Sequence, residues 1–141
     1  MKPIKLLSIC LYLMAVFHLI VGAGLTLSPA FQQFAVHVYG CHFDWTVKDV
    51  YLVRVLGAFA FTFGVMAIAA ARDPIRNRAI ILGFIVLFIV RDVSRHVYFS
   101  ELSQGFGLDA TTNLITTFFF AIQGGVIAVL AWITRKEKTG S

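Results

Sequence analysis

The sequence predicts an all-α membrane protein: a bundle of four transmembrane helices that forms a single domain over residues 1–141. Three observations support this fold class. The chain is 59% apolar and only 13% charged, whereas soluble domains have roughly 45–50% and about 25%. Four apolar stretches are long enough to span a bilayer. The basic residues gather at the ends of these stretches, predominantly on one predicted side.

The first apolar stretch covers residues 6–27 and follows Lys2 and Lys5. A secretory signal peptide also begins this way, and the small residues at 22–24 could serve as its cleavage site. However, a signal core has only about 7–15 apolar residues, and this stretch is longer. We therefore expect it to remain as the first transmembrane helix.

Three further spans are expected, over residues 50–71, 79–99 and 114–133. A short basic turn, residues 72–78, joins the first two of these. Its Pro74 cannot continue the preceding helix. The second and third transmembrane helices are therefore predicted to be antiparallel neighbours.

Positive charges orient the predicted bundle, because Lys and Arg concentrate on the cytoplasmic side of membrane proteins. The loops of one side contain only Lys48. The opposite side contains Lys2, Lys5, Arg72, Arg76, Arg78, Arg135, Lys136 and Lys138. We predict a multi-pass inner-membrane protein with both termini in the cytoplasm. Because these charges act as topology signals, the net charge of +5 does not indicate nucleic-acid binding.

The two outer loops differ in pattern. In the longer one, Phe31, Phe34, Ala35 and Val38 recur at helical spacing, which predicts a short amphipathic helix on the outer leaflet or over the bundle. Gly40 is expected to end this helix. The second loop, residues 100–112, is expected to be a turn region.

Small residues four positions apart allow helices to approach closely. Two such pairs occur, Ala60 with Gly64 and Ala121 with Gly125. They could serve packing within the bundle or contact with another subunit. Cys10 and Cys41 are predicted to lie a membrane apart, so no disulfide is expected between them.

The ionisable groups inside the predicted spans are all expected in the outer halves. At about 1.5 Å per residue, Arg91 lies about 12 Å below the outer boundary, His18 and Gln123 about 14 Å, and Arg54 about 6 Å. Buried charges are costly and should face the bundle interior. The candidate binding residues are His18, Arg54, Arg91, Asp92, Arg95, His96 and Gln123.

Two interpretations of this polar cluster stay open. Asp92 and Arg95 have the spacing of an ion pair, and Asp92 could also reach Arg54. The remaining positive charge would suit a carboxylate or phosphate. Alternatively, Arg95 and His96 extend to the interface and nothing binds.

Metal and cofactor signals are weak. The loop residues His37, Cys41, His42 and Asp44 are metal-ligand types, but Gly40 interrupts them and we predict no metal site. A haem would need two histidines at one depth, whereas His96 lies about 9 Å above His18. The cofactor is left unknown. Although Asp92 and His96 could form an acid–base pair, no catalytic residue is assigned, and a non-catalytic role is favoured over an enzyme.

The pattern Gly-x-Gly-Leu-x-Leu-x-Pro at 22–29, the segment Arg-Val-Leu-Gly-Ala at 54–58 and the basic turn resemble the small bacterial four-helix membrane proteins of the BphX-like and DoxX-like type. The resemblance implies a four-span accessory subunit of a membrane assembly and carries over no catalytic residues. The loop 36–45 lies outside it.

Two functions are therefore carried forward. The first is an accessory or structural subunit that docks on other membrane helices or on copies of itself. The alternative is a protein that binds or transports a small amphipathic anion or lipid through an outward-facing, arginine-rich pocket within the membrane.

Overall fold

The computed structural model describes residues 2–139, with side chains through Lys136. In this part of the chain every regular element is a helix, which confirms the all-α class. The helices are α1 (Pro3–Leu27), α2 (Pro29–Val38), α3 (Val47–Arg72), α4 (Arg78–Val97), α5 (Phe99–Phe106) and α6 (Ala110–Thr139).

Three helices of the described chain are long and apolar enough to cross a membrane: Pro3–Leu27, Val47–Arg72 and Ala110–Lys136. They correspond to the first, second and fourth predicted spans, which supports a membrane protein. The third predicted span is also a helix, α4, but Arg91, Asp92 and Arg95 lie close together toward its C-terminal end. The membrane crossing by α4 therefore stays a prediction.

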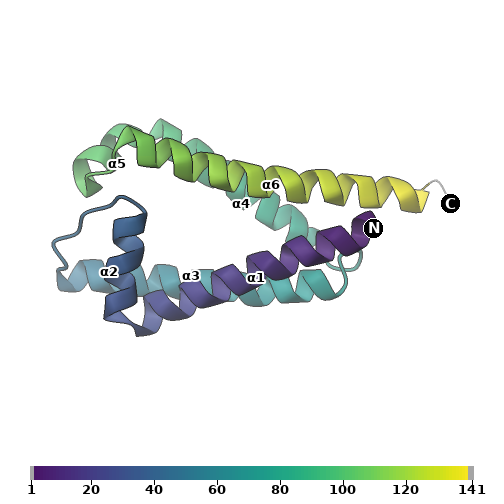
Figure 1. The fold of residues 1–141 in the computed structure, drawn as a ribbon, viewed down its shortest axis with the longest axis horizontal. Coiled ribbons are helices and arrows are strands. Elements are labelled where there is room, and N and C mark those ends of the chain that lie inside the picture. The colour runs from purple at the N-terminus through teal and green to yellow at the C-terminus, as the bar shows by residue number, and fades with distance from the viewer. Residues whose placement is uncertain (1, 140–141) are drawn as a thin grey trace.

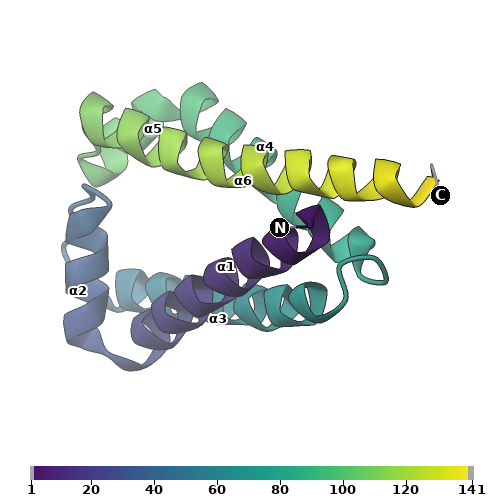
Figure 2. The same ribbon diagram turned by 45° about the vertical axis from the view of Figure 1, so that its right-hand side comes forward.

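The long helices form two pairs, α1 with α3 and α4 with α6 (Figure 1). The pairs meet where the α3–α4 turn lies beside the first turns of α1, and we call this the converging end. At the other end, the splayed end, the pairs diverge and α2 stands across the space between them (Figure 2). At the splayed end, α2 and the loop that follows it therefore lie between the two helix pairs (Figure 2).

Glycines set the close contact between α1 and α3. A Cβ atom at Gly22 would run into the backbone of Phe61, and one at Gly64 would strike Leu19. Ser8 also joins the two helices, since its Oγ donates to the Ala71 carbonyl oxygen at 2.9 Å. The Gly64 motif therefore serves packing within the molecule.

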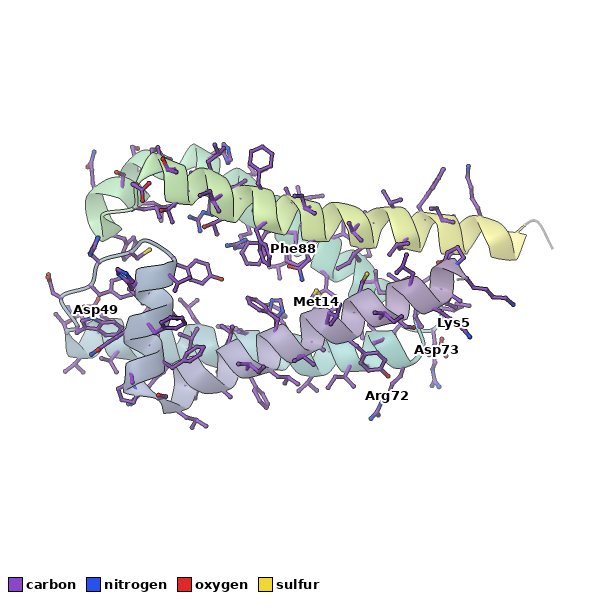
Figure 3. The ribbon with its side chains drawn as sticks, in the orientation of Figure 1. Lys5, Met14, Asp49, Arg72, Asp73 and Phe88 are labelled. Carbon is purple, nitrogen blue, oxygen red and sulfur yellow. The ribbon has the colours of Figure 1, made fainter. Side chains whose placement is uncertain are left out.

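The apolar core lies where the two pairs meet. Figure 3 shows Met14 of α1 and Phe88 of α4 between the pairs. Both side chains are buried, and they belong to one cluster that draws on all four long helices. Its other members include Leu7, Leu11, Ala67, Ala70, Ile81, Phe84, Phe120, Ile127 and Leu130.

The predicted helix of the first long loop is present as α2, but only part of its predicted apolar face is buried. Gln32 and Ala35 are buried, whereas Phe34 is 62% exposed and Val38 58%. The reason is a hydrogen bond, because Gln32 Nε2 donates to the Leu25 carbonyl oxygen at 2.6 Å and ties α2 to the end of α1. Gly40 follows α2 with a φ of 70°, a conformation that favours glycine.

The second outer loop was expected to be a turn region, but it contains the helix α5. Its half-buried residues Phe99, Leu102, Ser103 and Phe106 fall on one face, and Gly107 ends it with a φ of 67°. The chain after α2 docks here: the backbone N–H of His42 donates to the Phe106 carbonyl oxygen at 2.7 Å. The link after α2 is thus tied to the α5 end of the other helix pair.

Candidate functional site

The candidate site begins with Arg91 on α4. Its Nη1 lies 3.7 Å from Asp92 Oδ1, and the two side chains are only 26% and 16% exposed. On its other side, the guanidinium carbon lies 3.4 Å from the centroid of the Phe120 ring on α6. The charge of Arg91 is therefore held between one carboxylate and one aromatic face.

Arg95 lies one turn further along α4 and contacts α6 directly. Its Nε donates to Asn113 Oδ1 at 2.9 Å, and Asn113 is only 7% exposed. The predicted Asp92–Arg95 ion pair is wrong, because Asp92 pairs with Arg91. Both arginines thus bridge α4 to α6, one through a ring and one through an amide.

Two further polar side chains lie within electrostatic range of these arginines. One is His18 on α1, which is within range of Arg91 and whose Nδ1 lies 2.9 Å from the Met14 carbonyl oxygen. The other is Tyr39, at the end of α2, within range of both Arg91 and Arg95. Burial raises the pKa of the Tyr39 phenol, and the two positive charges act in the opposite direction. The Tyr39 phenol is therefore neutral at neutral pH.

Several buried polar atoms here have no hydrogen-bond partner in the described part of the chain. They include one guanidinium nitrogen of each arginine, together with an acceptor on Asp92 and oxygens from two residues of α6. The atoms are Arg91 Nη1, Arg95 Nη2, Asp92 Oδ1, Thr117 Oγ1 and Gln123 Oε1. Buried polar groups are normally satisfied, so this collection marks the site as chemically incomplete by itself.

An apolar groove of about 350 Å³ lies between α1 and α6. Its lining residues are Cys10, Leu13, Met14, Phe17, Phe119, Ile122, Gln123, Val126 and Ile127. Because Leu13 is 67% exposed and Ile122 is 63% exposed, the groove opens on the side of the molecule. Gln123 therefore belongs to the groove and is one of the residues with an unpartnered oxygen.

Aromatic contacts connect the groove to Arg91. The rings of Phe17 and Phe119 are 6.3 Å apart across the groove. Phe17 contacts the ring of His18 at 5.2 Å, and Phe119 contacts Phe120 at 5.1 Å. The groove thus ends beside the ring that carries the Arg91 charge.

Two of the predicted site residues lie apart from this cluster. Arg54 is exposed on α3 and lines a shallow hollow with Trp45 and Tyr51. His96 is exposed as well, and its Nδ1 lies 3.1 Å from the Asp92 carbonyl oxygen of its own helix. The structure therefore brings together His18, Arg91, Asp92 and Arg95, with Gln123 on the adjoining groove.

Four residues of the site were not predicted from the sequence: Tyr39, Asn113, Thr117 and Phe120. The last three follow one another at i, i+4 and i+7, a spacing that places them on one face of α6. This signal was available, but the predicted span began only at residue 114. Tyr39 had no such signal, because its position relative to the arginines depends on the angle between α2 and α1.

Among the described residues, no three His, Cys, Asp or Glu side chains gather in a group that could hold a metal ion. Cys10 and Cys41 are both free thiols. Burial raises the pKa of the Cys41 thiol, while Arg95 lowers it.

No family model, curated protein or solved structure matches this chain. The resemblance to the BphX-like and DoxX-like proteins stays a prediction, and function is argued from the site alone.

Proposed function

We propose that the protein binds an amphipathic anion within the membrane, with Arg91 and Arg95 holding the anionic group. The observation that carries this proposal is the pair of buried guanidinium nitrogens, Arg91 Nη1 and Arg95 Nη2, that have no hydrogen-bond partner in the described structure, Arg91 Nη1 having only the 3.7 Å ion pair with Asp92. A carboxylate or phosphate would supply the missing acceptors through charge-assisted hydrogen bonds.

The charge balance of the cluster supports the same proposal. Two arginines face a single carboxylate, Asp92, and its contact at 3.7 Å is an ion pair without a hydrogen bond. An uncompensated charge inside a membrane costs at least about 2.5–3.5 kcal/mol. A bound anion would offset this cost, and the hydroxyl groups of Thr117 and Tyr39 could donate to it.

The proposal includes the predicted topology, in which α4 crosses the membrane as a fourth span. Its Arg91, Asp92 and Arg95 then lie inside the bundle rather than against lipid, as polar groups in a span require. Lys5, Arg72 and Asp73 lie at the converging end and Asp49 at the splayed end (Figure 3). The positive-inside rule would place the converging end and both termini in the cytoplasm of an inner-membrane protein.

Docking on other membrane helices is the second candidate, and a feature of α6 favours it. A Cβ atom at Gly125 would meet no other atom within 4 Å, and Ala121 one turn earlier is exposed. This second small-residue pair is therefore not used inside the molecule. It remains available for close contact with a helix of an accessory partner or of another copy.

The test is binding of radiolabelled dodecanoate to the purified protein in a neutral detergent, measured by scintillation proximity. Arg91→Gln is compared with Arg54→Gln, which removes an exposed arginine outside the cluster. Loss of one charged hydrogen bond predicts a roughly ten- to hundredfold weaker affinity for Arg91→Gln and an unchanged affinity for Arg54→Gln. Equal losses in the two variants, or equal displacement by dodecanol, would overturn anion recognition at this site.

A further inference from the structure

The groove between α1 and α6 adjoins the arginine cluster through contacts between aromatic rings. The Phe17–Phe119 end of the groove adjoins His18 and Phe120, and Phe120 carries Arg91 at 3.4 Å. Gln123 lines the groove and keeps a buried oxygen without a partner in the described chain. The apolar groove thus ends at Phe119, with the Phe120 ring between it and the excess positive charge of the cluster.

We infer that the ligand is a single-chain amphiphile that enters sideways from the bilayer, with its alkyl chain in this groove and its anionic head at Arg91 and Arg95. The inference rests on the proposed function. It adds the class of ligand, an alkyl carboxylate or alkyl phosphate, and the route of entry.

The size of the groove favours one chain. Its volume of about 350 Å³ is roughly that of a dozen water molecules. From Phe119 to Val126 the groove follows α6 for about 11 Å at the helical rise. These dimensions suit one extended chain of moderate length better than the two chains of a phospholipid.

The lining of the groove explains lateral entry. Leu13 and Ile122 lie at its rim and are 67% and 63% exposed, so in a bilayer they would face lipid tails. A chain could slide between them without leaving an apolar environment. In the proposed orientation the head lies toward the outer side and the chain toward the bilayer centre, as in an outer-leaflet lipid.

The groove favours binding by positioning the alkyl chain rather than through the hydrophobic effect. Lipid tails are as apolar as the groove, so transfer of the chain between them contributes little. The groove instead holds the chain so that the head meets the arginines, while the apolar tail stays out of the polar interior. Filling the groove should therefore weaken binding even though it removes no polar contact.

The experiment uses dodecanoate with a diazirine at its terminal carbon, photolysed with the full-length protein in a neutral detergent. Crosslinks mapped by mass spectrometry are expected on the parts of α1 and α6 that contain Cys10 and Val126. Excess dodecanoate or dodecyl phosphate should prevent them, whereas dodecanol should not. The competitor that prevents crosslinking at the lower concentration shows whether the site prefers a carboxylate head or a phosphate head.

A matched pair of variants tests the groove itself. Ile122→Trp fills it, whereas Leu82→Trp places the same ring at a site on α4 with similar exposure, 60% against 63%, outside the groove. Labelling should fall roughly tenfold in Ile122→Trp, which corresponds to about 1.4 kcal/mol, and stay unchanged in Leu82→Trp. Equal labelling of the two variants, or anion-sensitive crosslinks confined to other helices, would overturn the groove assignment while leaving anion binding intact. If neither anion affects the wild-type crosslinks, the proposed function itself fails.

Discussion

The guanidinium group of Arg91 on α4 lies over the Phe120 ring of α6, with 3.4 Å between the guanidinium carbon and the ring centroid. The Phe120 side chain is only 5% exposed, so this contact is shielded from solvent. An arginine over an aromatic face is attracted by the negative face of the ring. The contact therefore fixes the guanidinium group while leaving Nη1 free of hydrogen bonds within the described chain.

The energy of this contact can be measured with a double-mutant cycle of Arg91→Gln and Phe120→Leu. We expect a coupling of roughly 1–2 kcal/mol, since a partly desolvated cation–π pair has about this strength. Unfolding in mild detergent is the measurement. Arg91→Lys serves as the control that keeps the charge but loses the planar group. Strict additivity of the single changes would show that the ring does not hold the arginine.

Asn113 offers a way to separate stability from binding. Asn113→Ala removes the acceptor for Arg95 Nε, and leaving a buried charged donor unpaired should cost about 1–3 kcal/mol. Asn113→Asp keeps an acceptor and adds a negative charge, which neutralises the excess positive charge of the cluster. This variant should unfold at least as late as Asn113→Ala yet lose dodecanoate binding. An Asn113→Asp protein that binds with wild-type affinity would contradict the role of positive charge.

The α1–α3 contact should be sensitive to a single methyl group. At Gly22 the added Cβ meets the Phe61 backbone, which cannot rotate away, so Gly22→Ala should destabilise the protein by about 1–3 kcal/mol. Gly83→Ala is the matched control, because nothing lies within 4 Å of its Cβ position. Removing a glycine from the interior of a helix should stabilise it by roughly 0.5–1 kcal/mol. Thermal unfolding of both variants should therefore shift in opposite directions.

Topology is tested with impermeant thiol labelling in intact cells. In a protein with Cys10→Ser and Cys41→Ser, a cysteine introduced by Gln104→Cys on exposed α5 should be labelled. One introduced by Ile75→Cys, in the exposed part of the α3–α4 turn, should be labelled only after the cells are opened. The opposite pattern would reverse the proposed orientation, and labelling of both sites in intact cells would exclude α4 as a span.

Helix positions could be predicted because apolar runs and breaking residues act locally. The α3–α4 turn at Pro74 and the end of α2 before Gly40 follow from residues that limit their own backbone. The helix α5 was missed because two glycines suggested a loop, although Gly105 is tolerated inside the helix and Gly107 ends it.

The sequence predicted which helices carry the polar side chains, but not the direction in which each side chain points. Counting residues placed Arg54 and Arg91 in the outer halves of the predicted spans, yet of the two only Arg91 packs against a neighbouring helix, through the Phe120 ring of α6. Val53 beside Arg54 is buried at 3% exposure, and one residue along a helix changes direction by about 100°. Which side of α3 is buried depends on how α3 crosses α1. The residues around Arg54 do not indicate this crossing.

The pairing of the helices has a consequence for synthesis. Both partners of the first pair, α1 and α3, precede the α3–α4 turn in the chain, and both partners of the second pair, α4 and α6, follow it. Each half can therefore complete its main helix contact alone, and the first can do so while the second is still on the ribosome. A chain divided at the α3–α4 turn and produced as two polypeptides should reassemble in the membrane. The second polypeptide would already contain the contacts between the two arginines and their α6 partners.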